Sequence, residues 1–236
     1  MNLIITCARS LESETKNEIS KILDELGDQE PEILNVGMRG ILMVNTIIEP
    51  SKIIDYVKNK IIEEPLKDVY TVPFFSEKFC NILLDEMKHL EAHFGFNPNP
   101  EEDNLRQIPE ITFQDNCPQI FQSLMQTIYT IGNPIFLNIW NRHVDSGGIQ
   151  IANYNLKDKK QGAWHHDASA DISMVVPLNT GKYKGGGTEF LKRGTVEPLP
   201  TGHALIFPSF THMHRGLAVE SGDRYLLVFW LKCLQE

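Results

Sequence analysis

The sequence predicts an α+β protein, in which a small N-terminal α/β unit precedes supporting helices and an all-β sandwich or barrel. Three observations lead to this fold class. Residues 1–65 combine strand-length apolar runs with helical periodicity, and two more amphipathic segments follow. From Pro134 onward, short apolar runs alternate with glycine-containing turns. We therefore expect two domains, residues 1–65 and residues 66–236.

The N-terminal unit is predicted to contain two strands and two helices. Residues 3–5 and 41–44 are apolar runs of strand length. One helix ends before Gly27, because glycine commonly follows a helix C-terminus. A second helix begins after Pro50, and Pro65 closes the unit.

The second domain begins with helices and continues with strands. Ser76 is a suitable N-cap for a helix with one apolar face, and another helix is predicted around Leu124. Residues 97–118 contain four prolines and no clean period, so we expect a long surface loop there. Apolar runs predict strands at residues 135–140, 149–154, 172–178, 204–207 and 225–231.

Composition narrows the class of protein. The hydrophobic share of 42% and the charged share of 22% are typical of a soluble globular protein. A net charge of −9 disfavours nucleic acid as the main partner, because phosphate binding needs a positive surface. The four cysteines form no C-x-x-C pair, which indicates isolated thiols in a reducing compartment. The first residues lack the features of a signal peptide or membrane span, so we expect a cytoplasmic protein.

His165 and Asp167 form an H-x-D pair just before a predicted strand. Residues two apart on an extended chain point the same way, so the imidazole and carboxylate can provide two ligands for one metal ion. His214 is the best candidate for the third ligand. Two histidines and one carboxylate are the ligand set of non-haem iron(II) oxygenases. An isolated H-x-D pair also arises by chance, so its meaning depends on what accompanies it.

Arg224 accompanies the pair, ten residues after His214 and at the start of an apolar strand. A guanidinium that points inward from this position needs an anionic partner, since an unpaired buried charge is costly. The distal carboxylate of a dicarboxylate co-substrate matches the planar guanidinium with two parallel hydrogen bonds. The spacing therefore links the candidate metal site to a co-substrate site.

Several motifs in one order resemble the catalytic domain of procollagen lysyl hydroxylases, over roughly residues 60–232. They are residues 165–169 (HHDAS), 177–179 (PLN), 183–191 (YKGGGTEFL), 211–217 (THMHRGL) and 222–225 (GDRY), preceded by residues 64–65, 68–70 and 73–80. The resemblance implies a double-stranded β-helix (jelly roll) with the site in its mouth. It also implies an oxidoreductase, an iron(II)- and 2-oxoglutarate-dependent dioxygenase that hydroxylates an unactivated C–H bond and releases succinate and CO₂. The implied cofactors are Fe(II), 2-oxoglutarate as co-substrate and, as a further candidate, L-ascorbate.

The resemblance also implies roles for individual residues. His165, Asp167 and His214 match the iron ligands, and Arg224 matches the co-substrate anchor. Tyr154, eleven residues before His165, matches a tyrosine that hydrogen-bonds the co-substrate, although simple packing in a strand is an equal alternative.

Neighbouring residues receive simpler interpretations. We expect His166 and His212 to be orienting or surface groups, and Asn179 to be a turn former. Residues 185–187 are expected to form a tight strand connection, because no helix or lysine pattern of a phosphate-binding loop follows them. Trp164 either walls the pocket or packs in the core.

Residues 1–65 resemble small archaeal THUMP domains, a family that binds RNA, chiefly tRNA, in modifying enzymes. The similarity lies in residues 6–12, 18–19, 40–42 and 53–65. Charge does not favour RNA binding, because residues 1–70 contain eight Lys or Arg against thirteen Asp or Glu, a net of −5. The alternative is an N-terminal cap that packs on the oxygenase.

Three functions are therefore compared. A hydroxylase of lysyl side chains in a protein or peptide is favoured by the length and kind of the resemblance. The alternative is a hydroxylase of a tRNA nucleoside or small molecule, targeted by the N-terminal unit. A non-catalytic jelly-roll binding protein is disfavoured by the intact ligand set. The sequence names neither the substrate nor the oligomeric state.

Overall fold

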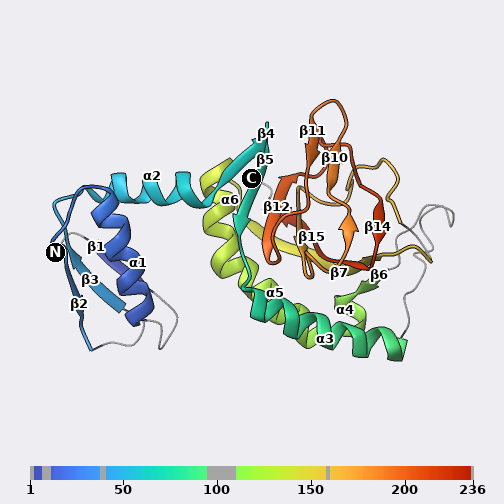
Figure 1. Ribbon diagram of the computed structural model, residues 1–236, viewed down its shortest axis with the longest axis horizontal. Coiled ribbons are helices and arrows are strands. Elements are labelled where there is room, and N and C mark those ends of the chain that lie inside the picture. The colour runs from blue at the N-terminus through green and yellow to red at the C-terminus, as the bar shows by residue number, and fades with distance from the viewer. Residues whose placement is uncertain (1–2, 7–11, 38–40, 95–109, 158–159, 235–236) are drawn as a thin grey trace. The chain divides into compact units, whose positions relative to one another are not determined.

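The apolar runs and amphipathic segments assemble into two units, Met1–Ile62 and Glu63–Glu236, in the computed structural model. The structure describes residues 3–6, 12–37, 41–94, 110–157 and 160–234 (Figure 1). Residues 7–11 and 38–40, which fall in two of the segments similar to THUMP domains, lie outside the described residues. The division falls before the expected boundary at residue 65, because Pro65 lies in a strand that pairs within the second unit.

The first unit is an antiparallel three-stranded sheet with two helices. The strand order is β1 (Leu3–Thr6), β3 (Ile41–Asn45) and β2 (Glu32–Asn35), and the helices are α1 (Glu12–Glu25) and α2 (Pro50–Ile61). Buried apolar side chains from the sheet and both helices form one core: Leu23, Ile33, Leu42, Val44 and Ile53. Strand β2 was not predicted, since its apolar residues number only two.

Asp28 closes the turn after α1. Gly27 adopts a left-handed conformation with φ of +99°, and Asp28 follows it with only 6% of its surface exposed. The Asp28 carboxylate accepts hydrogen bonds from the Thr46 hydroxyl and from the backbone N–H of Ile47 at 3.1 Å. This side chain therefore ties the end of α1 to the segment after β3.

The second unit contains two facing β-sheets. The larger has the order β4 (Glu63–Leu66), β5 (Val69–Pro73), β12 (His203–Pro208), β8 (Ile172–Pro177), β15 (Arg224–Cys233), β7 (Val144–Tyr154) and β6 (Glu110–Thr112). The smaller has the order β11 (Gly194–Val196), β10 (Thr188–Phe190) and β13 (His214–Gly216), and a separate pair joins β14 (Val219–Ser221) to β9 (Lys184–Gly185). Leu205 and Phe207 of the larger sheet pack against Phe190 and Val196 of the smaller, so the apolar core lies between the sheets.

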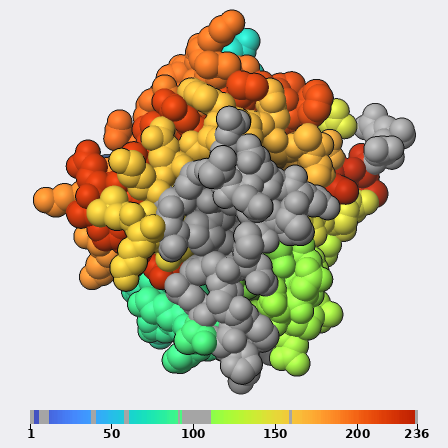
Figure 2. Space-filling view, turned by 90° about the vertical axis from the view of Figure 1, so that its right-hand side faces the viewer, coloured from blue at the N-terminus to red at the C-terminus, as the bar shows by residue number. Residues whose placement is uncertain are grey.

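Helices form the next layer of this unit. They are α3 (Glu77–Phe94), α4 (Phe113–Asn116), α5 (Pro118–Thr127), the π-helical turn Ile128–Gly132 and α6 (Asn133–Trp140). The Ser76 hydroxyl accepts a hydrogen bond from the backbone N–H of Phe79 at 3.2 Å, which supports the expected N-cap. Figure 2 shows one face of the unit, with the yellow-to-red surface of the strand-rich half above the teal and green surface of helical segments.

Two local predictions were wrong. Residues 135–140 form helix α6 instead of a strand, because a continuous apolar run has no period that separates the two structures. Pro134 in the first turn and Asn141, left-handed with φ of 53°, are the helix signals at its two ends. Part of the expected loop 97–118 is also ordered, as β6, α4 and the start of α5. The rest of that prediction, residues 97–109, lies outside the described residues.

The described cysteines are isolated thiols, as expected. Cys80, Cys117 and Cys233 are free and buried, whereas Cys7 lies outside the described residues. Burial is the main cause that raises the pKa of Cys80 and of Cys233 to about 11. Among the described residues, no helix combines the length and apolarity that a membrane crossing requires.

Candidate metal centre

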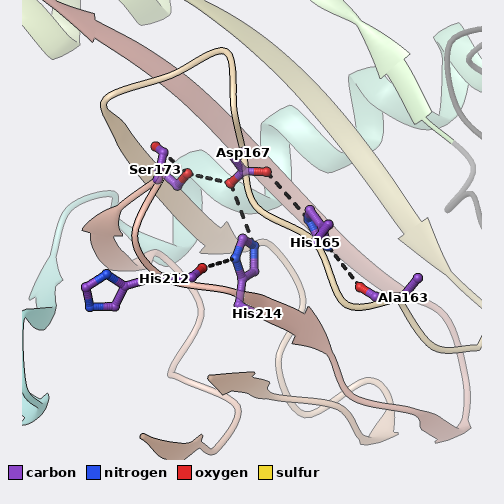
Figure 3. Close-up of polar contacts among 7 residues, drawn as sticks. Ala163, His165, Asp167, Ser173, His212 and His214 are labelled. Carbon is purple, nitrogen blue, oxygen red and sulfur yellow. Dashed lines mark hydrogen bonds and ion pairs between the residues drawn. The ribbon is translucent and has the colours of Figure 1, made fainter. Parts of the chain in front are cut away.

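The structure brings the three expected ligands together (Figure 3). His214 begins strand β13 of the smaller sheet, and Asp167 lies in the segment that leads into β8 of the larger sheet. One potential ligand atom from each of His165, Asp167 and His214 lies within 4.8 Å of the others. In the part of the chain that the structure describes, no other group of three or more His, Cys, Asp or Glu side chains is brought together in this way.

The two histidine rings are oriented by backbone carbonyls. Nδ1 of His165 lies 2.9 Å from the carbonyl oxygen of Ala163, and Nδ1 of His214 lies 2.9 Å from that of His212. A carbonyl oxygen only accepts, so each Nδ1 carries the proton and donates it. Each Nε2 then keeps its lone pair, and it faces Asp167 at 3.5 Å for His165 and 3.7 Å for His214. This tautomer leaves both imidazoles ready to bind one cation.

Asp167 is held in the ionised state that a metal ligand needs. Burial alone would raise its pKa, but interactions with His165, His214 and the Ser173 hydroxyl together lower the pKa below the usual value. The Ser173 hydroxyl donates to Oδ2 of Asp167 and lies 2.8 Å from the hydroxyl of Ser209. Both serines are completely buried, so their hydroxyls fix the position of the carboxylate.

His214 is held in the neutral state. Burial is the main cause that lowers its pKa to about 4, although the nearby Asp167 carboxylate acts in the opposite direction. A neutral imidazole and an ionised carboxylate are the protonation states that bind a cation. The donor set of two nitrogens and one carboxylate therefore fits Fe(II), and it leaves positions free for other ligands.

The neighbouring histidines are not part of the cluster. His166 is exposed, and its ring centre lies 6.2 Å from that of Phe210. His212 is buried, and its backbone carbonyl orients His214. The expectation of an orienting or surface role for these two residues agrees with this arrangement.

The ring of Trp164 stacks against the guanidinium of Arg215 next to the cluster. The guanidinium carbon of Arg215 lies 4.6 Å from the centre of the half-buried Trp164 ring. Arg215 also forms an ion pair with Glu189, with an Nη2–Oε2 distance of 2.6 Å. Trp164 directly precedes His165, and Arg215 directly follows His214. The stack therefore supports the backbone that carries these two candidate ligands.

Arg224 lies where strand β15 begins, with 4% of its surface exposed. It is directly opposite Tyr154 on the neighbouring strand β7, and its guanidinium carbon lies 5.2 Å from the Tyr154 ring centre. Nε and Nη1 of Arg224 are buried without a hydrogen-bond partner. Buried polar groups are normally satisfied, so two unsatisfied guanidinium nitrogens indicate a site for an anion.

These nitrogens border a pocket between the two sheets. Its lining includes Val175, Leu205 and Leu226 of the larger sheet and Thr188 of the smaller, with Arg224 and Tyr183 as further members. Glu197 is an acidic member of the lining, and most of the other members are apolar. The guanidinium of Arg224 therefore fits the distal carboxylate of 2-oxoglutarate.

Asn179 has a role at this site that the sequence did not show. Its backbone forms the expected turn, since its carbonyl oxygen accepts a hydrogen bond from the Lys182 N–H at 3.0 Å, and its side chain in addition bridges to the start of β15. Nδ2 donates to the carbonyl oxygen of Asp223 at 2.8 Å, and Oδ1 accepts from the backbone N–H of Tyr225 at 3.0 Å. The two bonds flank Arg224 and hold its backbone.

Residues 185–187 form the expected tight connection between β9 and β10. All three glycines have positive φ, with values of 77°, 85° and 101°. A side chain at Gly185 or Gly187 would also collide with backbone oxygens, at 2.6 Å from Ala218 and 2.8 Å from Val196. Glycine is required here by both conformation and space.

Comparison with known proteins supports the same interpretation. No protein-family model matches the chain. The multifunctional procollagen lysine hydroxylase and glycosyltransferase of Caenorhabditis elegans is 27% identical over 195 residues, which is 78% of this chain and 26% of that protein. Procollagen-lysine,2-oxoglutarate 5-dioxygenase 2 of Homo sapiens is 27% identical over 188 residues, covering 75% of this chain and 26% of its own. The chain thus spans about a quarter of the length of these relatives.

Solved structures share the fold at low sequence identity. A prolyl-4-hydroxylase of Pseudomonas putida aligns with a TM-score of 0.52 and 18% identity, over 71% of this chain and 94% of its own. The non-haem α-ketoglutarate-dependent carbocyclase SnoK aligns with a TM-score of 0.55 and 12% identity, over 70% and 79%. The chain therefore has the jelly-roll fold of 2-oxoglutarate oxygenases and resembles the procollagen-lysine dioxygenases in sequence over about three quarters of its length.

Proposed function

We propose that this protein is an Fe(II)- and 2-oxoglutarate-dependent dioxygenase that hydroxylates a lysyl side chain of a protein or peptide. The single observation that carries the proposal is the occurrence, within one jelly roll, of the His165–Asp167–His214 cluster and the unsatisfied guanidinium of Arg224. A metal cluster alone fits many functions. The additional anion site in the same jelly roll restricts the possible functions, because it fits an acidic co-substrate.

Each side chain has a defined task in this proposal. His165, Asp167 and His214 would hold Fe(II), and Arg224 would bind the distal carboxylate of 2-oxoglutarate, with the Tyr154 ring packed against the guanidinium. When bound, iron and 2-oxoglutarate supply the oxidising chemistry, in which O₂ gives one oxygen atom to the substrate C–H bond and one to succinate, with loss of CO₂.

The protein contributes geometry and a dry environment. Ser173 and the carbonyl of His212 fix two of the ligands, and Asn179 fixes the backbone on both sides of Arg224. Apolar side chains around the pocket exclude water from the co-substrate. These contacts hold the reacting groups in position before the substrate binds.

The lysyl substrate is supported by the named relatives. The activities for which these relatives are named concern procollagen lysine, and the match covers 71 to 78% of this chain in several of them. Prolyl hydroxylases share only the fold, at 18% identity or thereabouts, so they support a peptide substrate less directly. The net charge of −5 in residues 1–70 gives no support for tRNA as the substrate.

The test is oxidation of defined peptides by the purified full chain. Lysine-containing collagen-like peptides are incubated with Fe(II), 2-oxoglutarate and O₂, with and without L-ascorbate, and both succinate and peptide mass are measured. We expect succinate release and a mass gain of one oxygen on lysine, both abolished by a chelator. Oxidation of the matched proline peptide or of bulk tRNA instead would overturn the lysyl assignment, and no succinate with any of them would overturn the oxygenase.

A further inference from the structure

Two tyrosines approach Arg224, and their hydroxyl groups have different surroundings. The Tyr154 hydroxyl lies against the backbone of Gly216, since a Cβ placed on that glycine would be 2.4 Å from it. The Tyr183 hydroxyl is buried without a hydrogen-bond partner, in a residue that is only 8% exposed. Tyr183 therefore carries an unsatisfied buried group of the same kind as the guanidinium of Arg224.

The two unsatisfied groups belong to neighbouring side chains. Gly186, with φ of +85°, places its backbone against both of them. A Cβ on Gly186 would lie 3.2 Å from Cε2 of Tyr183, 3.1 Å from Cδ of Arg224 and 3.3 Å from Nε of Arg224. The missing side chain at residue 186 thus makes room for the tyrosine and the arginine to converge.

Both residues also line the pocket between the sheets, among apolar neighbours such as Val175 and Leu226. Their aromatic and aliphatic parts pack normally, and Tyr183 belongs to a cluster that includes Tyr154, Val219 and Leu226. Only the polar ends are unsatisfied. Burial of donors without acceptors on two neighbouring side chains is unfavourable, and an acceptor shared by both would remove the cost.

We propose that Tyr183 is a second anchor for the distal carboxylate of 2-oxoglutarate, an inference that rests on the function proposed above. The phenolic O–H of Tyr183 donates to the carboxylate while the guanidinium of Arg224 donates to it as well. A carboxylate offers several acceptor positions, so it can satisfy both donors at once. The pair makes the pocket selective for oxo acids that carry a second carboxylate.

The test compares two oxo acids in binding experiments that need no turnover. The full chain is loaded with Zn²⁺, and the affinities of 2-oxoglutarate and of 2-oxobutanoate, which lacks the distal carboxylate, are measured by calorimetry. We expect Tyr183→Phe to weaken 2-oxoglutarate binding about tenfold and to leave 2-oxobutanoate binding unchanged. Tyr129→Phe is the matched control, because Tyr129 is an exposed residue whose hydroxyl donates to the backbone carbonyl of Asp145, and it does not line the pocket.

Thermal unfolding without ligand provides the second readout. The Tyr183 hydroxyl has no partner in the free protein, so Tyr183→Phe should unfold at the same temperature as the wild type or a higher one. The temperature increase produced by 2-oxoglutarate should be smaller in this variant. A lower unfolding temperature without ligand would assign the hydroxyl a structural role and overturn the inference.

The outcomes separate this inference from the proposed function. If the wild type binds 2-oxoglutarate and Tyr183→Phe binds it equally well, the second anchor is wrong while the oxygenase proposal stands. An equal loss of affinity for both oxo acids also contradicts the anchor, because the effect would not depend on the distal carboxylate. If the wild type with metal binds no 2-oxoglutarate, the proposed function itself fails.

Discussion

His165 and His214 exchange two backbone hydrogen bonds, His165 N–H to the His214 carbonyl at 3.0 Å and His214 N–H to the His165 carbonyl at 2.9 Å. This bridge joins the segment before β8 to strand β13 and sets the ring centres 4.4 Å apart. The spacing of the two imidazoles is therefore fixed by the backbone. A metal ion would enter a site whose geometry is already formed.

Loss of one ligand should remove the metal but keep the fold. We expect Asp167→Ala to lose bound Fe(II) and all succinate release, because only two ligands remain, while the His165–His214 bridge keeps the local backbone in place. Metal content per chain and circular dichroism measure the two effects. His166→Ala is the matched control, since this exposed neighbour lies outside the cluster. A metal-loaded Asp167→Ala protein would refute the ligand assignment.

Ser173 should affect metal affinity without binding the metal. Its hydroxyl donates to Asp167, so Ser173→Ala frees the carboxylate to rotate, and we expect Fe(II) affinity to fall by about 10- to 100-fold. Competition with a chelator of known affinity measures this change. Ser209→Ala provides the comparison, because the Ser209 hydroxyl contacts the Ser173 hydroxyl and reaches Asp167 only through it. Equal effects of the two substitutions would show that the direct bond is not the cause.

Asn179 should contribute to both stability and co-substrate binding. In Asn179→Ala the Asp223 carbonyl and the Tyr225 N–H lose their partners, and we expect the free energy of unfolding to fall by about 1–3 kcal/mol. The KM for 2-oxoglutarate should rise, because the backbone of Arg224 is no longer held on both sides. Denaturant unfolding and initial-rate kinetics measure the two effects. Asn35→Ala, which removes an exposed turn bond, should change neither.

Gly202 should tolerate no side chain. A Cβ at this position would lie 2.0 Å from the carbonyl oxygen of Phe75, and its φ is +84°. Gly181 has φ of +89° but nothing within 4 Å of a Cβ. We expect Gly181→Ala to cost about 1–2 kcal/mol of unfolding free energy through conformation alone, and Gly202→Ala to cost clearly more. Equal losses in the two variants would contradict the close approach to Phe75.

Asp28 should make the N-terminal unit sensitive to acid. The hydrogen bond from Thr46 is the main cause that lowers the pKa of Asp28, and backbone N–H groups of Ile47 and Glu30 add to it against the effect of burial. Because the folded pKa lies below the unfolded one, the stabilisation is present above the unfolded pKa and is lost as pH falls through the folded pKa. Asp28→Asn should reduce hydrogen-exchange protection in residues 12–37 at pH 7 and flatten its decline below pH 4. An unchanged acid response would refute this role.

The parts of the site that were predictable depend on local spacing. Asp167 lies two positions after His165, and Arg224 lies ten positions after His214, so the chain pattern alone indicated a ligand set and an anchor. Ser173, Asn179 and Tyr183 were not assigned to the site, because their contacts join segments that only the fold brings together. The bond from Asn179 to Asp223 spans 44 residues and leaves no local pattern.

The same distinction applies to the fold. Short apolar runs between glycine-containing turns identified four of the seven strands of the larger sheet, β7, β8, β12 and β15. Helix α6 was assigned wrongly, because its apolar run offers no contrast between faces until the packing of the π-helical turn and β7 is known. Tertiary contacts decided the structure where local preference was ambiguous.

The three candidate ligands are not equally accessible, so one side of the centre faces solvent and the other side is buried. The side chain of His165 is 45% exposed, whereas those of Asp167 and His214 are 7% and 8% exposed. A chelator, an oxygen molecule or a substrate side chain that approaches from solvent therefore meets the imidazole of His165 first. Changes around His165 should act on how quickly an ion enters and leaves, while changes around the two buried ligands should act on how tightly it is held.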